Sequence, residues 1–154
     1  MNRLPLGFLL AAACLSAAPA EAQNTRLRLS GFLGNMGNNT VAQYDQGFRD
    51  SATGTLFRVD ITSLNTIRTT SVYIRANAAT MSNGKPVGEC YWRRTDLATW
   101  NPLTTTDALI ESRVIQTNGT LWSNTVFFRC DLAWASDAPG TPSVGLTFTL
   151  QVTP

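Results

Sequence analysis

The sequence predicts an all-β fold, a single antiparallel β-sandwich of about seven or eight strands with immunoglobulin-like or jelly-roll-like architecture. In several short runs apolar residues alternate with other residues, which is the period of a strand with one buried face. Clusters of Gly, Asn and Pro between these runs predict tight turns. Two cysteines in the same region suit an exported domain. We therefore expect two facing layers, pinned across residues 90 and 130.

The first 22 residues have the layout of a secretory signal peptide and are excluded from the fold. Met1-Asn2-Arg3 gives a basic start, residues 6–15 form an apolar stretch too short to span a bilayer, and Ala20-Glu21-Ala22 fits a small-x-small cleavage pattern. We expect an exported protein, periplasmic, on the cell surface or extracellular, with one β-sandwich domain at 23–154. Cys14 offers a second interpretation, a lipid-modified cysteine.

Composition argues against several functions for the mature chain. Without Arg3 and Glu21 of the leader, the 12 basic and 10 acidic residues become 11 and 9, and the net charge stays at +2. This charge is too small and too dispersed to indicate nucleic-acid binding. No later run reaches the roughly 18 apolar residues of a transmembrane span. Histidine is absent, so histidine-based catalytic triads are impossible.

The clearest strands lie near the C-terminus. Residues 126–134 and 144–152 both alternate between apolar and other residues, and residues 137–142 between them are rich in Pro and Gly. We expect these two runs to be adjacent strands of one half-buried sheet. Shorter alternating runs predict further strands at 27–29, 57–61 and 72–78.

Asn118-Gly119 is the best hairpin signal, because a two-residue type I′ turn there would pair Ile115 with Trp122. The same register places Glu111 opposite an inward-facing apolar position. That conflict requires a β-bulge, a shorter hairpin, or a helix over residues 107–115. We prefer a strand for 107–115 and keep the helix as the alternative.

Cys90 and Cys130 are predicted to form a disulfide, because an even pair of cysteines in an exported chain is normally oxidised. Two buried free thiols are the alternative. Trp92 and Trp134 share the alternation of the two cysteines and are expected to pack in the core around the bridge. Trp92 follows Cys90 too closely for the immunoglobulin spacing, so the prediction concerns sandwich architecture and not that topology.

Little catalytic chemistry is recognisable, and we expect no catalytic residue, no metal site, no cofactor and no enzymatic activity. Lys85 is the only lysine, and the sequence Asn83-Gly84-Lys85-Pro86 predicts a turn tip, where a desolvated nucleophile is not expected. A glycosidase needs two neighbouring carboxylates, and calcium needs several oxygen ligands. The carboxylates on predicted strands are Asp60, Glu89, Glu111 and Asp131. The acidic pairs that flank loops are Asp45 with Asp50 and Asp131 with Asp137.

Aromatic and arginine side chains provide the best candidate ligand site. Carbohydrate-binding modules use exposed rings as flat apolar platforms with polar rims. For such a module we expect the rings of Trp100 and Trp122 to be exposed and close together. The candidate binding residues are Tyr91, Arg93, Arg94, Trp100 and Trp122.

Three functions follow from these observations, in order of preference. The first is a structural or adhesive component of the cell envelope, whose terminal strands pair with copies of itself or with other envelope proteins. It is favoured by low charge, the absence of a catalytic set, and an alternating strand at the C-terminus. The alternative is that the terminal strands simply complete their own sheets. The second function is binding of carbohydrate or another small ligand, and the third is a carboxylate-based hydrolase.

Overall fold

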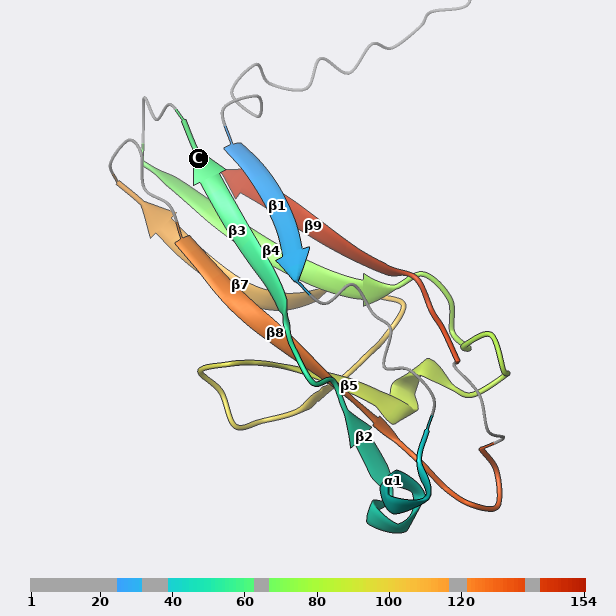
Figure 1. Ribbon diagram of the computed structural model, residues 1–154. Helices are drawn as coiled ribbons and strands as arrows, with labels where there is room; N and C mark the ends of the chain where they lie inside the picture. Colours follow the sequence, from blue (N-terminus) through green and yellow to red (C-terminus); the bar gives the residue numbers. More distant parts are fainter. Residues whose placement is uncertain (1–24, 32–38, 63–66, 117–121, 138–141) are drawn as a thin grey trace, which may run out of the picture.

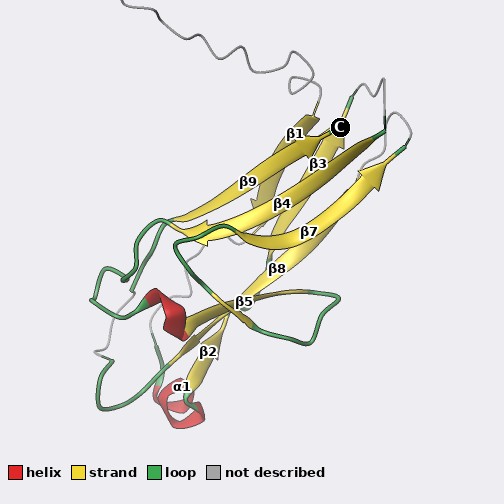
Figure 2. Ribbon diagram, turned by 180° about the vertical axis from the view of Figure 1, so that it is seen from behind, coloured by secondary structure: helices red, strands yellow, loops and turns green. Residues whose placement is uncertain are grey.

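The computed structural model describes residues 25–31, 39–62, 67–116, 122–137 and 142–154 and is an all-β sandwich, as predicted (Figure 1). The leader and Asn118-Gly119 lie outside the described residues. Two antiparallel sheets face each other, and both views show them as two layers (Figure 2). None of the described helices has the length and apolar character needed to cross a membrane.

The larger sheet, sheet A, has the strand order β1-β3-β8-β5-β6, and β2 also pairs with β8. Sheet B has the order β7-β4-β9. The strands of sheet A are β1 (Thr25–Gly31), β2 (Phe48–Asp50), β3 (Thr55–Ile61), β5 (Cys90–Arg94), β6 (Asn101–Pro102) and β8 (Trp122–Asp131). Those of sheet B are β4 (Arg68–Ala76), β7 (Ala108–Ile115) and β9 (Leu146–Thr153). Two short helices, α1 (Val41–Gln46) and the 3₁₀ helix η2 (Val87–Glu89), lie outside the sheets.

Two predicted strand pairings are wrong. β8 and β9, expected to be neighbours, belong to different sheets, and β7 pairs with β4 instead of forming a hairpin with β8. The predicted pairing of Ile115 with Trp122 therefore does not occur, and Ile115 pairs with Arg68. Alternation reports which face of a strand is buried, and strands from opposite layers bury their apolar faces in the same core.

Residues 108–115 form a strand, which confirms the preferred interpretation over the helix. The strand contains a β-bulge, because Val72 pairs with Glu111 while the next residue of β4, Tyr73, pairs with Leu109. Ile110 is left without a partner in the ladder, so both Ile110 and Glu111 are buried although they are consecutive. The bulge thus turns a carboxylate towards the space between the two layers.

The core lies between β3, β8 and β5 of sheet A and β4 and β7 of sheet B. The Cys90–Cys130 disulfide is present as predicted, but it links the neighbouring strands β5 and β8 and does not pin one layer to the other. Trp92 is buried near it, as expected. The buried apolar cluster includes Phe57, Val59, Ile61, Val72, Ile74, Ala76, Trp92, Ile110, Ile115, Trp122, Val126 and Phe128.

Trp134 is the exception, because 59% of its surface is exposed where a core position was expected. β8 ends at Asp131, so the alternation that includes Leu132 does not extend to Trp134. The Trp134 ring instead stacks on Tyr44 of α1, with 4.5 Å between the ring centroids. α1 begins after Thr40, whose side chain caps the helix, and ends at Gly47 with a φ of 81°.

Candidate functional site

Three of the five predicted binding residues come together on the outer face of sheet A. Cys90 and Trp92 of β5 face the core. Successive side chains of a strand point to opposite faces, so Tyr91 and Arg93 face outwards. Trp100, just before β6, lies against Arg93, whose guanidinium carbon is 4.9 Å from the centre of the ring. These three side chains therefore share one outward surface.

Neighbouring strands add three residues to this surface that the sequence analysis missed. The Arg129 guanidinium lies 4.6 Å from the Trp100 ring centre and 3.8 Å from that of Phe48, and Arg93 also approaches Phe127. The alternation around Cys130 predicts that Phe127 and Arg129 face outwards. Only the β5–β8 register shows that they lie beside Arg93 and Tyr91 of β5. We call this surface the arginine–aromatic cluster: Phe48, Tyr91, Arg93, Trp100, Phe127 and Arg129.

The charge of this cluster is partly neutralised. Asp50 accepts two hydrogen bonds from Arg129, at 2.6 Å and 2.8 Å, and this contact is the main reason that the pKa of Arg129 is raised. The Tyr91 hydroxyl donates to Asp131 at 3.1 Å, which raises the pKa of the phenol. Guanidinium groups also lie against the Trp100 ring, so the ring is not a bare platform.

The other two predicted residues, Arg94 and Trp122, do not belong to this surface. Trp122 is only 4% exposed, so the expectation of exposed Trp100 and Trp122 rings side by side is wrong. Its position in β8 has the inward direction of Val126 and Phe128. The indole N–H of Trp122 donates to the Thr70 hydroxyl at 3.1 Å, which satisfies this buried polar group.

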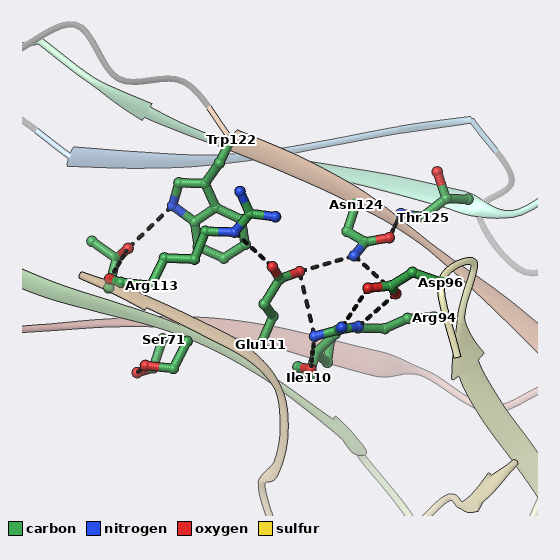
Figure 3. Close-up of polar contacts among 11 residues, drawn as sticks. Ser71, Arg94, Asp96, Ile110, Glu111, Arg113, Trp122, Asn124 and Thr125 are labelled. Atoms are coloured by element: carbon green, nitrogen blue, oxygen red, sulfur yellow. Dashed lines mark hydrogen bonds and ion pairs between the residues drawn. The ribbon is translucent and has the colours of Figure 1, made fainter. Parts of the chain in front are cut away.

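Arg94 instead joins a polar network that closes one long side of the sandwich (Figure 3). Glu111, buried by the bulge, accepts from Arg113 Nε at 2.6 Å and from Asn124 Nδ2 at 2.9 Å, and Arg94 Nη1 lies 3.6 Å from its carboxylate. Asp96 pairs with Arg94 and accepts from Asn124. We call this network the charged seam: Arg94, Asp96, Glu111, Arg113 and Asn124.

The charged seam contains two acidic and two basic groups that stabilise one another. The hydrogen bond with Asp96 is the largest cause of a raised pKa at Arg94, and burial acts in the opposite direction. The reciprocal hydrogen bond from Arg94 is the main cause of a lowered pKa at Asp96. These ionised side chains, together with the amide of Asn124, join β5, β7 and β8, so they hold sheet A to sheet B. We assign them a structural role.

Lys85 is not the solvated turn residue that the sequence predicted. Its side chain is only 5% exposed, and Nζ lies 2.7 Å from Glu89 Oε2 and 2.9 Å from each carboxylate oxygen of Asp137. The turn folds back on residues 132–137, which sequence proximity could not reveal. Residues 83–86, Glu89, Ser136 and Asp137 line a pocket of about 250 Å³. We call Lys85, Glu89 and Asp137 the lysine cluster.

The carboxylates considered for hydrolysis and for calcium binding have protein partners. Asp60 pairs with Arg28 and Arg58, while Asp45 accepts from the Trp134 indole N–H at 3.1 Å. Within the described ranges, no group of three or more His, Cys, Asp or Glu side chains is arranged to hold a metal ion. Glu89 and Asp137 bind the same ammonium group, and Asp137 was not among the strand carboxylates named from the sequence.

On the opposite long side of the sandwich, apolar side chains pack towards the core. There β1 and β9 approach each other, β1 at the edge of sheet A and β9 at the edge of sheet B (Figure 1). Each pairs with one strand only among the described strands. We call this side the terminal-strand edge. The apolar side chains of β1 and β9 that pack against the core, none of them fully buried, are Leu27, Leu146, Phe148 and Leu150.

Comparison with known proteins adds no functional assignment. No family model, no curated protein and no solved structure matches the chain. The argument for function therefore rests on the geometry of the terminal-strand edge and of the three polar clusters.

Proposed function

We propose that this chain is a non-catalytic, exported structural protein of the cell envelope, which associates with further copies of itself by pairing strands at the terminal-strand edge. The observation that carries the proposal is the unprotected state of β9. This strand of eight residues contains no charged residue and no proline, and it pairs with β4 alone among the described strands. A long edge strand without charges or proline is a ready template for another strand.

The other sheet edges support the choice of β9, because they carry features that oppose strand pairing. β6 has two residues, one of them Pro102, which lacks a backbone N–H. β7 is bent by its bulge and directs Glu111 inwards. Short strands, prolines, bulges and inward charges are the usual protections of an edge. β1 is intermediate, with leucines facing inwards and arginines facing outwards.

The incomplete burial of β9 also supports association at the terminal-strand edge. The inward residues of β3 and β4, such as Phe57 and Val72, have no exposed surface, whereas Phe148 and Leu150 of β9 are only half-buried. Covering the remaining apolar surface with a second chain would stabilise the complex by about 25 cal/mol for each Å² removed from water. Backbone hydrogen bonds along the free side of β9 would fix the register.

Sedimentation velocity of the mature chain over a concentration series tests the proposal. We expect reversible association, and a strictly monomeric chain at every concentration would contradict it. The double variants Thr149→Lys with Gln151→Lys and Thr149→Glu with Gln151→Glu place like charges on the outer face of β9. Each should remain monomeric, and an equimolar mixture should associate again if β9 pairs with β9.

The matched control carries the same charge at the other edge of sheet B. Ser112 and Val114 are exposed residues of β7, and the variant Ser112→Lys with Val114→Lys should associate like the unmodified chain. Loss of association in the β7 variant alone would move the contact to β7 and overturn the assignment to β9. If lysines on β9 block association but the mixture does not restore it, β9 pairs with a different strand such as β1.

A second candidate function is carbohydrate binding at the arginine–aromatic cluster. The observation in its favour is that Tyr91, Arg93 and Trp100 share one outward surface, where rings and guanidinium groups alternate. Titration with neutral and acidic oligosaccharides, followed by tryptophan fluorescence, would detect such binding. Trp100→Ala should abolish the signal, and Trp134→Ala, which removes an exposed ring elsewhere, should preserve it. A signal that survives Trp100→Ala would exclude this site.

A further inference from the structure

The only lysine of the chain occupies an unusual place. Lysine is almost never fully buried unless it is paired, and the Lys85 side chain is 5% exposed beside Asp137, which is 6% exposed. Glu89, the second carboxylate of the lysine cluster, is 48% exposed. The cluster thus consists of a buried amine, a buried carboxyl group and a third group that reaches water.

The geometry of the cluster holds the amine against the carboxyl group of Asp137. Nζ of Lys85 lies 2.9 Å from both Oδ1 and Oδ2 of Asp137, so it faces the whole carboxyl group. The backbone N–H of Ala133 donates to Oδ2 at 2.8 Å, and the Tyr44 hydroxyl donates to the Asp137 carbonyl oxygen at 3.0 Å. These contacts fix the orientation of Asp137, which is the condition for a high effective concentration of reacting groups.

We propose that Lys85 and Asp137 condense in the folded chain to an isopeptide bond between Nζ and Cγ, with Glu89 as the catalytic group that transfers protons. The inference is independent of the proposed assembly, because it concerns only contacts within one chain. It assigns an autocatalytic modification to a cluster in which the sequence predicted an ordinary turn.

The reaction balances without an oxidant or a second substrate. A proton passes from Nζ to the Asp137 carboxylate through Glu89, which leaves a neutral amine and a neutral acid. The nitrogen lone pair attacks Cγ, and the negative charge that develops on Oδ2 is stabilised by the Ala133 N–H. Glu89 then takes a proton from the nitrogen and delivers it to the Oδ1 hydroxyl group. The C–O bond breaks, one water molecule leaves, and the amide remains.

Two features of the cluster set the driving force and the rate. Condensation replaces two buried charges by a neutral amide, which removes the cost of keeping those charges out of water. Burial acts to lower the pKa of Lys85, but the hydrogen bonds and charges of Glu89 and Asp137 outweigh it, and the net pKa is raised. The amine of Lys85 is therefore held in its protonated form and must lose a proton before it can attack, so the bond should form more slowly than the fold.

Digestion with trypsin after reduction provides the test. Cleavage after Arg75 and Arg93, and after Arg129, separates the segment 76–93 with Lys85 from the segment 130–154 with Asp137. The Cys90–Cys130 disulfide joins the same two segments, so it must first be reduced and alkylated. We expect one linked peptide, lighter than the two segments together by one water molecule. Two separate peptides from the aged, folded protein would overturn the proposal.

Labelling of amines gives an independent readout, because Lys85 carries the only side-chain amine of the chain. After denaturation, an amine-reactive reagent should modify the N-terminus alone, and a labelled Lys85 would contradict the proposal. Asp137→Ala should restore the labelling and release both peptides. Glu89→Gln, checked by circular dichroism for an intact fold, should do the same, and an unchanged yield of linked peptide would remove Glu89 from the mechanism. Asp107→Ala, an exposed acid outside the cluster, should leave the link intact.

Discussion

The two long sides of this sandwich are closed by different means. On one side the charged seam joins β5, β7 and β8 through Glu111, Arg94 and Asn124. On the other side β1 and β9 meet through aliphatic and aromatic side chains that keep part of their surface in water. A charged network needs partners in fixed positions, whereas an apolar edge accepts any strand of suitable pattern.

The difference between the two sides indicates that the same residues of β7 protect the edge of sheet B and close the core. The bulge at Ile110 turns Glu111 inwards, and this charge both seals the seam and makes β7 a poor template for pairing. β9 has no equivalent device in its eight residues. One side of the molecule is complete in the monomer, and the other is completed, on our proposal, by a second chain.

The largest expected effect is the loss of stability when a phenylalanine is truncated. We compare a fully buried phenylalanine of sheet A with a half-buried one at the terminal-strand edge. Phe57 of β3 has no exposed surface, and Phe57→Ala should destabilise the chain by about 3–5 kcal/mol. Phe148 of β9 is half-buried, so Phe148→Ala should cost about half as much. Denaturant unfolding of the monomer measures both. Equal costs would show that the terminal-strand edge is packed as tightly as the centre.

Removal of the buried carboxylate tests the charged seam itself. Glu111→Ala leaves Arg113 without this carboxylate partner and Arg94 with Asp96 as its remaining carboxylate partner, and it should reduce the free energy of unfolding by about 3 kcal/mol. The control is Asp107→Ala, which breaks the exposed pair with Arg75 and should cost less than about 1 kcal/mol. Similar values for the two variants would mean that the seam is no stronger than a surface ion pair.

Sequence patterns predicted the faces of the strands better than their partners. The alternation around Val126 and Phe128 correctly predicted which side chains are buried, because burial of one face is a local property of a strand. Strand neighbours depend on contacts distant in sequence, so β8 and β9 were wrongly placed in one sheet. The prediction that Trp134 is buried was wrong for another reason, because the strand β8 ends at Asp131.

The candidate sites show the same limit. Tyr91, Arg93 and Trp100 are close in sequence and lie on one surface, while Arg129 joins them only through the β5–β8 register. Lys85 was expected at an exposed turn tip, because no sequence signal connects it to Asp137, which is distant along the chain. Residues that are brought together by folding of loops leave no periodic trace in the sequence.

Removal of the Arg113 guanidinium, which lies over the Trp122 ring, should moderately reduce the stability that the charged seam provides. Arg113 lies 5.0 Å from the centre of the Trp122 ring and donates to Glu111. Arg113→Ala should cost about 1 kcal/mol of stability, since the pair is partly exposed. It should also increase quenching of tryptophan fluorescence by acrylamide. Arg28→Ala, which removes an exposed arginine at the other side, should not change quenching, and equal quenching in both variants would remove Arg113 as a cover for the ring.

The smallest expected effect is a dependence of the charged seam on pH. Arg94 lowers the pKa of Asp96 in the folded chain, mainly through its hydrogen bond, so Asp96 stabilises the fold above its ordinary pKa of 3.8. This contribution is lost as the pH falls through the lower pKa of the folded state, where the carboxylate takes up a proton. Asp96→Asn should therefore be less stable than the unmodified chain at neutral pH and equally stable at strongly acidic pH. Unfolding by urea at a series of pH values measures the difference between the two proteins. A difference that stays constant from neutral to acidic pH would show that Asp96 acts through its hydrogen bonds to Arg94 and Asn124 and not through its charge.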